Sequence, residues 1–478
     1  MAKGSEELLA YIRQGHTMTQ AEKLRLIVSL SVPSILAQIS ATVMFFIDAA
    51  MVGHLGERAT AAIGLVETTT WLMGGLGAAA NLGFSVQVAH FIGANDFEAA
   101  RRVLRQGLLC CMLWGLLLMT TAIAIHRHLP FWLGGSPSIA HDASMYFLLI
   151  GVNGLFLQMS GLAGAMLKSS GNMKIPSMLN IAMCVMNVGF NYLFIYVMEL
   201  GVVGAAMGTG VAEFITAGLM LYFLLYRSPM LALFSRSQLR GKSAERAAGT
   251  IPFHTPTRSF RLPRLESTVI TTAVKIAAPM GLQHLLMGGA QIVSTIIVAP
   301  LGTVAIAANS LAITVESLCY MPGYGIAEAA TTLVGQGIGA GQRLLTRSFA
   351  YMSVGLGISV MTVMGVLMWL FAPELMGILT PVTDIIDLGA DVLRIEAWAE
   401  PMFAASIVCN GVFIGAADTL WPAMLSLASM WGVRLTLAAM LAPRFGLRGV
   451  WTAMAIELTC RGAVFMARML RGRWLKRN

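Results

Sequence analysis

Charged side chains are scarce in this sequence. Asp, Glu, Lys and Arg supply 12% of its 478 residues, whereas a soluble globular protein carries about 25%. Apolar runs recur from Leu26 to Phe465, and about 20 apolar residues are enough for a helix to cross a bilayer. The strand-length segments of alternating polar and apolar residues that a membrane barrel needs are missing. The sequence therefore excludes a soluble protein and predicts an all-α polytopic membrane protein.

Cysteine is also scarce, and its spacing argues against a metal site. The six cysteines lie inside apolar stretches, without the short paired spacings of metal ligands: Cys110, Cys111, Cys184, Cys319, Cys409 and Cys460. Small buried hydrophobic side chains describe them better than metal ligands or redox groups do. We therefore expect no metal and no cofactor.

Two further absences concern the N-terminus and nucleic acids. Residues 1–25 lack the apolar core and cleavage site of a secretory signal, so we expect the first span to direct insertion. The net charge is +9, but no basic patch is interleaved with base-stacking aromatics, which argues against nucleic-acid binding. The basic residues occupy alternate connections: Arg101, Arg102, Arg105, Lys168, Lys174, Arg343, Arg347, Arg468, Arg471, Arg473, Lys476 and Arg477. This alternation follows the positive-inside rule and predicts two cytoplasmic termini.

Turn residues divide the apolar runs into twelve expected transmembrane helices. They are residues 26–53, 59–92, 99–125, 139–167, 175–198, 202–226, 268–299, 303–337, 343–371, 386–415, 420–442 and 447–470. The expected domains are a cytoplasmic segment (1–25), an N-lobe (26–226), a basic cytoplasmic linker (227–267), a C-lobe (268–471) and a basic cytoplasmic tail (472–478). The proline-containing linker is expected to lie along the inner leaflet.

The two sets of six spans repeat. When residues 33–94 are shifted by 246 positions without a gap, sixteen of the 62 positions are identical, including Pro33 with Pro279 and Gly56 with Gly302. Because each half has an even number of spans, both copies enter the membrane in the same direction. We therefore expect two pseudo-symmetric six-helix lobes, related by a two-fold axis along the membrane normal, around a central cleft suited to alternating access.

One acidic residue breaks the repeat inside the membrane. Asp48 aligns with Ser294 in the second copy. A carboxylate at bilayer depth is costly and is by default functional, and burial favours its neutral form, so a proton or a small cation can set its state. Pro33 lies about four turns earlier on the same helix and can bend it. The alternatives are an acid that reaches water at the helix end and an ordinary membrane-helix proline.

Two other groups of polar residues stand out. Asn187 and Asn191 are four residues apart and share a helix face, and Thr209 follows in the next span. Together they suit a cation ligand set or hydrogen bonds to Asp48; the alternative is ordinary helix–helix hydrogen bonding.

In the second half, Glu396 and Glu400 are also four residues apart, just before Pro401. They suit a second proton or substrate site. The alternative, which the sequence favours, is internal ion pairing with Arg434 or Lys275.

Several stretches, in their order and spacing, resemble the multidrug and toxic compound extrusion (MATE) family. They are "IDAAMVGHLG", "GNMKIP", "NVGFNYLFIYVMELGVVGAAMGTG" and "GQGIGAG", and the resemblance covers about residues 24–470. It implies two six-helix lobes around a central cleft. It also implies a secondary antiporter that expels organic cations, dyes and drugs in exchange for Na⁺ or H⁺.

The resemblance implies roles for individual residues. Carried over by position, the acid of the family's N-lobe site falls on Asp48, the bending proline on Pro33, the fifth-helix asparagine on Asn187 and the following threonine on Thr209. On this basis, protonation of Asp48 from outside would weaken its bonds to the asparagines, let the first helix bend at Pro33 and displace the bound substrate.

The chain departs from the family pattern at two positions. Asn191 stands where the family often has Asp, and Met287 stands where one branch has a glutamate. The chain is therefore most similar to the DNA-damage-inducible F branch, in which proton coupling is usual. A single carboxylate also favours H⁺ over Na⁺, which prefers several hard oxygen ligands and negative charge.

Flexible thioethers and aromatic rings suit a cleft that accepts many shapes. The candidates for substrate contact are Met44, Phe45, Gln283, His284 and Met287, each of which also suits plain packing.

Two rival functions are a lipid-linked precursor flippase, which favours a cationic cleft, and a polytopic membrane transferase. The transferase needs an acid pair, a His cluster or a phosphate-cradling loop at an inner-face connection, and the sequence has none there. We therefore expect a transporter, not an enzyme. Its partners would be cationic or lipophilic small molecules and the lipid bilayer, and it would work as a monomer in the inner (plasma) membrane.

Overall fold

The computed structural model describes residues 4–234 and 265–475, and these are almost entirely helical, with no strand among them. The first half contains α1 (Ser5–Gln14), α2 (Gln20–Gly53), α3 (Glu57–Gly93), α4 (Phe97–Ile125), α5 (Leu129–Trp132), α6 (Pro137–Ser169), α7 (Lys174–Tyr192), η1 (Leu193–Val197), α8 (Gly201–Tyr222) and η2 (Phe223–Arg227). The second half contains α10 (Ser267–Val298), η3 (Ala299–Leu301), α11 (Thr303–Gly339), α12 (Arg343–Leu370), α13 (Ala372–Leu379), α14 (Thr383–Ala397), α15 (Glu400–Gly415), α16 (Leu420–Ser429), η4 (Met430–Leu435) and α17 (Thr436–Leu470).

The helices provide twelve membrane crossings within the described residues. Ten helical segments are long and apolar enough to span a bilayer, and the pair α14 and α15, bent by 59°, forms one more. The last of the ten, Leu420–Leu470, has 51 residues, a length of about 75 Å against a hydrocarbon core of about 30 Å. It is not one rod, because Gly446 has non-helical torsion angles (φ 60°, ψ −141°) and divides it into two crossings. This confirms the predicted all-α fold.

The internal repeat is visible in the helix bounds. Shifted by 246 residues, α3 (57–93) falls on α11 (303–339), and α6 (137–169) falls on the stretch 383–415 covered by α14 and α15. The turns match as well: Gly56 and Gly302 open α3 and α11 with φ values of 106° and 98°. Glycine adopts such positive values without the steric cost that a side chain brings. The same chain geometry is therefore built twice.

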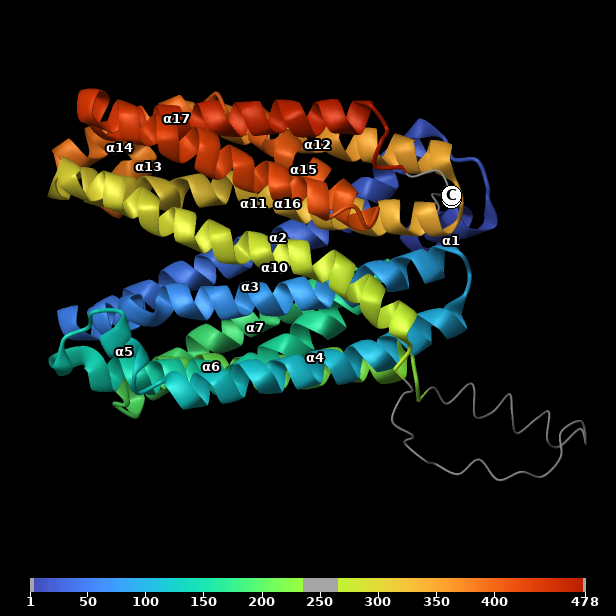
Figure 1. Ribbon diagram of the computed structural model, residues 1–478, viewed down its shortest axis with the longest axis horizontal. Coiled ribbons are helices and arrows are strands. Elements are labelled where there is room, and N and C mark those ends of the chain that lie inside the picture. The colour runs from blue at the N-terminus through green and yellow to red at the C-terminus, as the bar shows by residue number, and fades with distance from the viewer. Residues whose placement is uncertain (1–3, 235–264, 476–478) are drawn as a thin grey trace, which may run out of the picture.

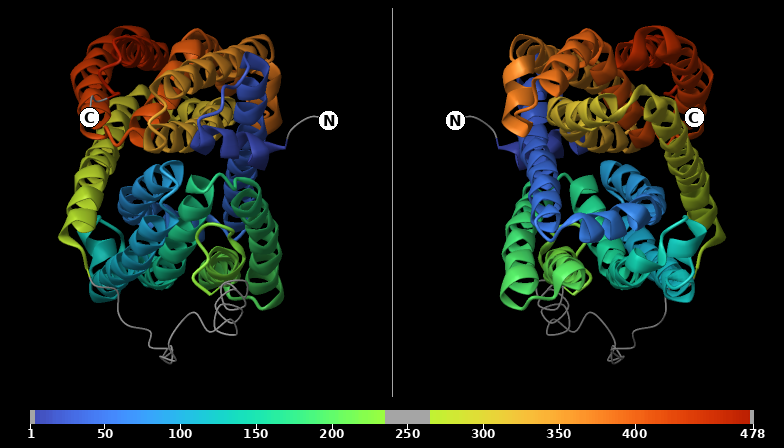
Figure 2. Two further views of the ribbon diagram at one scale, coloured as in Figure 1. Left: turned by 90° about the vertical axis from the view of Figure 1, so that its right-hand side faces the viewer. Right: turned by 90° about the vertical axis from the view of Figure 1, so that its left-hand side faces the viewer.

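The two lobes lie side by side along the long axis, and α2 and α10 run between them on opposite sides (Figures 1 and 2). Within the N-lobe α6 packs on α3, α4 and α8, and within the C-lobe α15 packs on α11, α12 and α17. The lobes meet through α2 on α11 and α3 on α10, which are equivalent pairs under the repeat, and through α3 on α11.

The lobes approach most closely at the end that carries the basic connections. A Cβ atom on Gly93 would overlap the backbone oxygen of Gln336, and one on Gly339 would overlap the oxygen of His90. Small residues allow membrane helices to pack backbone against backbone. Gly93 and Gly339 are repeat equivalents, so the crossing of α3 and α11 is nearly symmetric.

Two local features differ from the expected helices. The segment 1–25 contains α1, and the first span begins at Gln20, where Thr19 and Glu22 form a capping box. The span expected as continuous over 386–415 breaks between α14 and α15, because Pro401 has no N–H to donate to the carbonyl of Ala397 and its ring clashes with that carbonyl. Most of the expected linker, residues 235–264, lies outside the described residues, as does the tail beyond 475.

Candidate functional site

A chain of hydrogen bonds in the N-lobe joins the four predicted polar residues. Asn191 Nδ2 donates to Asp48 Oδ1 at 2.8 Å and to Asn187 Oδ1 at 3.1 Å. Asn187 Nδ2 donates to Thr209 Oγ1 at 3.0 Å, and the threonine hydroxyl donates to the backbone oxygen of Ala205 at 3.1 Å. The chain crosses α2, α7 and α8, so residues up to 161 positions apart in sequence meet at one point.

The local sequence explains this meeting. Asn187 and Asn191 are one helical turn apart on α7 and face the same way. On α8, Gly204 and Gly208 are also one turn apart, and a Cβ atom on Gly208 would overlap Asn191 Oδ1. The glycines let α8 approach α7 closely. The Gly-xxx-Gly spacing in "GVVGAAMGTG" was visible in the sequence, but Gly208 was not among the predicted site residues.

The site has one negative charge at most and an unused acceptor. Asn187 and Asn191 are 0% and 1% exposed, and Asp48 is partly buried. No ion pair joins Asp48 to a basic residue of the described chain. Asn191 Oδ1 is buried without a hydrogen-bond partner, which is costly unless a donor or cation satisfies it. A proton carrier or a small cation beside Asp48 would do so.

A chelating metal site is not formed within the described ranges. No three His, Cys, Asp or Glu side chains among residues 4–234 and 265–475 are arranged to hold a metal ion. The oxygens near Asp48 come from amides and a hydroxyl, which are hard but neutral ligands.

The site exists in one lobe only. The positions equivalent to Asn187 and Asn191 are Val433 and Leu437, and the position equivalent to Asp48 is Ser294. Pro33, in contrast, has an equivalent in Pro279, and both prolines lie inside long helices, α2 and α10. The two lobes therefore share the proline, but the polar site is found in the N-lobe and has no equivalent at the matching C-lobe positions.

The C-lobe contains a different acidic cluster, at the bend between α14 and α15. Glu396 and Glu400 are 0% exposed, and all four of their carboxyl oxygens lack a hydrogen-bond partner. Neither forms an ion pair with Arg434 or with any other basic residue of the described chain, and Lys275 is exposed on α10. Arg434 is nevertheless partly buried among these acids and interacts electrostatically with Glu396, so the alternative of internal charge pairing stays open.

Neighbouring charges in the C-lobe are better satisfied. Glu457 accepts a hydrogen bond from Ser429 Oγ at 2.7 Å and pairs with Arg461 at 3.3 Å. The repeat equivalents of Glu316, Glu396 and Glu400 are Thr70, Ile150 and Gly154. These three residues line a cavity of 170 Å³ in the N-lobe between α3, α4 and α6. At the positions where the C-lobe has buried acids, the N-lobe has uncharged residues that line a cavity.

The five predicted substrate contacts are in different environments. Phe45 is 52% exposed and lies against Trp71, with the ring centroids 5.9 Å apart. His284 is exposed and lies close to Gly75 of the opposite lobe. Met44 is buried and Met287 packs against the cluster around Met430, while Gln283 is partly buried with an unpartnered Oε1. A role in substrate contact stays a prediction for all five.

Comparison with known proteins identifies the relatives. The profile of the MatE family matches residues 33–193 and 279–440, two stretches that begin 246 residues apart, as the repeat does. The probable multidrug resistance protein NorM of Thermotoga maritima is 24% identical over 457 residues, which cover 94% of this chain and 93% of that protein. The protein of the same name from Pseudomonas aeruginosa is 26% identical over 460 residues, covering 92% and 87% of the two chains.

Solved structures share the fold. A multidrug resistance MATE family transporter of the MOP superfamily, in an outward-facing conformation, matches over the whole of both chains with a TM-score of 0.85 and 20% identity. A MOP superfamily transporter from Pyrococcus furiosus matches equally completely, with a TM-score of 0.86 and 18% identity. Its binding pocket is described as having reverse polarity and as suggesting a different function. From the matches in both lobes and the shared architecture, the chain belongs to the MatE family of multidrug and toxic compound extrusion transporters.

Proposed function

We propose that this transporter is a secondary antiporter that exports cationic or lipophilic small molecules in exchange for H⁺. One observation carries the proposal: Asp48 is an unpaired acid in the membrane, held by Asn191, whose Oδ1 is itself buried without a partner. Such a site binds either a proton or a cationic molecule, and competition between the two couples their movements. The multidrug resistance names of the relatives support the cargo class.

In the proposed cycle, α2 links the protonation of Asp48 to movement of the lobes. When the cleft faces outward, Asp48 takes a proton, which removes its negative charge and so weakens the hydrogen bond that Asn191 donates to it. α2 then bends at Pro33, narrows the N-lobe side of the cleft and displaces the cargo. The lobes rock inward, Asp48 releases its proton to the cytoplasm, and new cargo binds.

Orientation and setting belong to the same proposal. The basic connections near Arg101 and Arg343 lie at the end where α3 and α11 cross closely at Gly93 and Gly339, here called the closed end. By the positive-inside rule this closed end would face the cytoplasm. The chain would then lie in the inner (plasma) membrane with both termini in the cytoplasm and act as a monomer.

The C-lobe acids have a place in this proposal. An unpaired buried carboxylate is costly, so Glu396 and Glu400 suit a second site that takes up protons.

Dye efflux from proteoliposomes tests the coupling ion. We expect a pH gradient to drive efflux and a Na⁺ gradient to leave it near background. Asp48→Asn keeps the hydrogen bond but cannot exchange a proton, so its efflux should fall at least tenfold and lose its pH dependence. Glu57→Gln, an exposed acid in the first turn of α3 outside the network, is the matched control and should behave as the parent protein does. Full pH-driven efflux by Asp48→Asn would refute proton coupling at this site.

A second variant separates H⁺ from Na⁺. Asn191→Asp places another carboxylate beside Asp48 and so supplies the negative charge that a Na⁺ site needs. We expect this variant to gain Na⁺-stimulated efflux. If the parent protein already responds to Na⁺, the ion is assigned wrongly although antiport stands.

A flippase for lipid-linked precursors is the alternative function. The reverse-polarity neighbour means that the fold does not fix the cargo. A flippase calls for a cationic cleft, whereas the N-lobe site has a carboxylate and no paired cation. A pH change in the vesicle lumen on addition of dye would support antiport, and its absence with scrambling of a labelled lipid diphosphate would support the flippase.

A further inference from the structure

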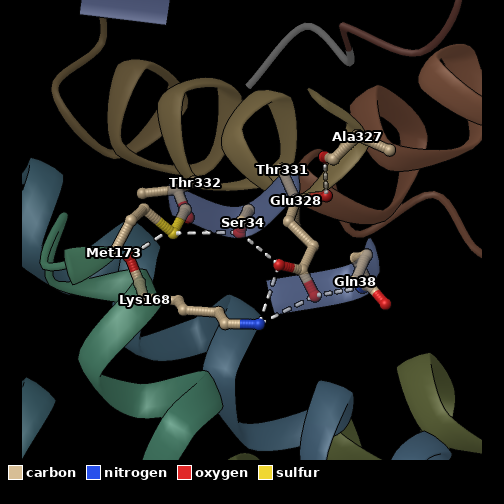
Figure 3. Close-up of polar contacts among 8 residues, drawn as sticks. All are labelled: Ser34, Gln38, Lys168, Met173, Ala327, Glu328, Thr331 and Thr332. Atoms are coloured by element: carbon tan, nitrogen blue, oxygen red, sulfur yellow. Dashed lines mark hydrogen bonds and ion pairs between the residues drawn. The ribbon is translucent and has the colours of Figure 1, made fainter. Parts of the chain in front are cut away.

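An ion pair joins the two lobes at their closed end. Lys168, at the end of α6, places its Nζ 2.7 and 2.8 Å from the two carboxyl oxygens of Glu328 on α11 (Figure 3). The lysine side chain is 20% exposed and the glutamate side chain 30%. Because α6 belongs to the N-lobe and α11 to the C-lobe, the lobes cannot separate here without breaking this pair.

The helix that carries Asp48 also holds the ion pair. Ser34 Oγ donates to Glu328 Oε2 at 2.5 Å, and Gln38 Nε2 donates to Oε1 at 3.3 Å (Figure 3). Ser34 is fully buried and directly follows Pro33, the point at which α2 lacks a backbone hydrogen bond. Bending of α2 at Pro33 therefore changes the position of a donor to Glu328.

Further polar contacts between the lobes surround the pair. Gln336 Nε2 donates to the backbone oxygen of Ser169 at 2.8 Å, and Thr332 Oγ1 donates to that of Lys168 at 3.1 Å. Water can replace each of these bonds when the lobes part, so the cost of opening is modest. A polar layer of this kind suits a contact that must form and break repeatedly.

The repeat shows that the charges are not needed for packing. The equivalents of Lys168 and Glu328 are Ile414 and Leu82, and these two side chains lie in one apolar cluster on the other side of the closed end. The same inter-lobe position is therefore filled once by an apolar contact and once by an ion pair. An apolar contact there is compatible with the fold.

We propose that Lys168 and Glu328, held by Ser34, form the inner gate of the transporter: a breakable latch whose rupture opens the lobes toward the basic end. The proposal rests on the alternating access proposed above. Lys168 and Glu328 act as positioning residues, because they set the balance between two arrangements of the lobes and do not bind cargo.

Distance measurements between the lobes test the gate. Glu98 and Leu344 are repeat equivalents that open α4 and α12 at the closed end, and both are strongly exposed. Spin labels at these two positions, in a protein without the accessible Cys110 and Cys460, report the separation of the lobes at that end. The readout needs neither cargo nor an ion gradient, so it distinguishes failure of the latch from failure of the proposed antiport.

The variants are expected to change the distance between the lobes in different directions. Glu328→Gln and Lys168→Met each lose charge-assisted bonds, so the ratio of separated to closed lobes should rise about tenfold. Lys168→Glu combined with Glu328→Lys restores opposite charges and should return the distances toward those of the parent. Lys168→Ile combined with Glu328→Leu copies the apolar side of the repeat; it should hold the lobes closed and slow dye efflux.

Three outcomes would overturn the latch. They are unchanged distances in both single variants, no recovery in the charge swap, and unimpaired efflux from the apolar double variant. If a single variant fails to fold, the charge-swapped and apolar pairs decide the question, because each restores a complementary contact.

Discussion

At the scale of the residue, the N-lobe site depends on one close approach between helices. Asn191 donates to Asp48 only because its amide fits against α8, and it fits because residue 208 has no side chain. A glycine inside a membrane helix is weakly helix-forming, so its presence here reflects packing. The acid, the amide and the glycine form a single unit.

Gly208→Ala should disrupt the packing of Asn191 and with it the hydrogen bond from Asn191 to Asp48. The added methyl group overlaps Asn191 Oδ1 and lies 2.8 Å from its backbone nitrogen, so α7 and α8 must shift, at a cost of about 1–3 kcal/mol. We expect a lower thermal midpoint and loss of pH-driven efflux. Gly218→Ala, on the same helix with no atom near its added Cβ, should leave both unchanged or raise stability slightly. Equal behaviour of the two variants would contradict the role of Gly208.

At the scale of the element, the N-terminal helix α1 packs across the closed end of the molecule and contacts both lobes. Leu8, Leu9 and Ile12 are 0–4% exposed and belong to a cluster that includes residues of both lobes, such as Leu26 and Leu333. Its last turn is held from both sides, because Asn95 Nδ2 donates to the oxygen of Arg13 at 3.0 Å and Gln342 donates to the oxygen of Ile12. The expected cytoplasmic segment, residues 1–25, therefore contains a helix that packs against both lobes.

Ile12→Ala tests the contribution of α1. Removing this fully buried side chain leaves a cavity between the lobes and should cost about 2–5 kcal/mol. Thermal unfolding in detergent should show a clear drop in midpoint. Glu7→Ala, on the exposed face of α1, serves as the control and should change the midpoint little. An unchanged midpoint in Ile12→Ala would mean that α1 is not a stable part of the closed end.

At the scale of the whole molecule, two nearly identical folds carry different chemistry. In the N-lobe, Asp48 has amide partners and Glu213 is buried on α8, whereas the C-lobe holds a cluster of four buried acids, Glu316, Glu396, Glu400 and Glu457. Glu457 forms an ion pair with Arg461, so loss of its negative charge would destabilise the fold. Glu396 and Glu400 form no direct ion pair, so the charged form of each is costly to bury.

Glutamine substitutions test which of these acids must be charged and which can be neutral. Glu396→Gln and Glu400→Gln resemble the protonated acids, so we expect stability within about 1 kcal/mol of the parent and fewer protons moved per dye molecule, measured as lumenal pH change against dye flux. Glu457→Gln leaves Arg461 buried without its counter-charge and should cost about 3–5 kcal/mol. If Glu396→Gln and Glu400→Gln leave the proton-to-dye ratio unchanged, the C-lobe acids are structural.

The sequence by itself determined the spans, the repeat and the residues of the Asp48 network. A bilayer requires a minimum length and hydropathy of each helix separately. The repeat is found by comparing the sequence with itself, because the two copies are 246 residues apart. The grouping of Asp48 with Asn187 and Asn191 was predictable because Asp48 breaks the repeat inside the membrane and the two asparagines share one helix face.

Only the tertiary structure decided which distant polar groups meet. The sequence placed Lys168 among several basic connection residues, and Glu328 was not among the predicted site residues. Their pairing depends on how two helices 160 residues apart rotate toward each other. The isolation of Glu396 and Glu400 depends on the bend between α14 and α15, and the docking of α1 depends on a groove formed by both lobes. Contacts of this kind follow from packing geometry, which neither composition nor periodicity along one helix contains.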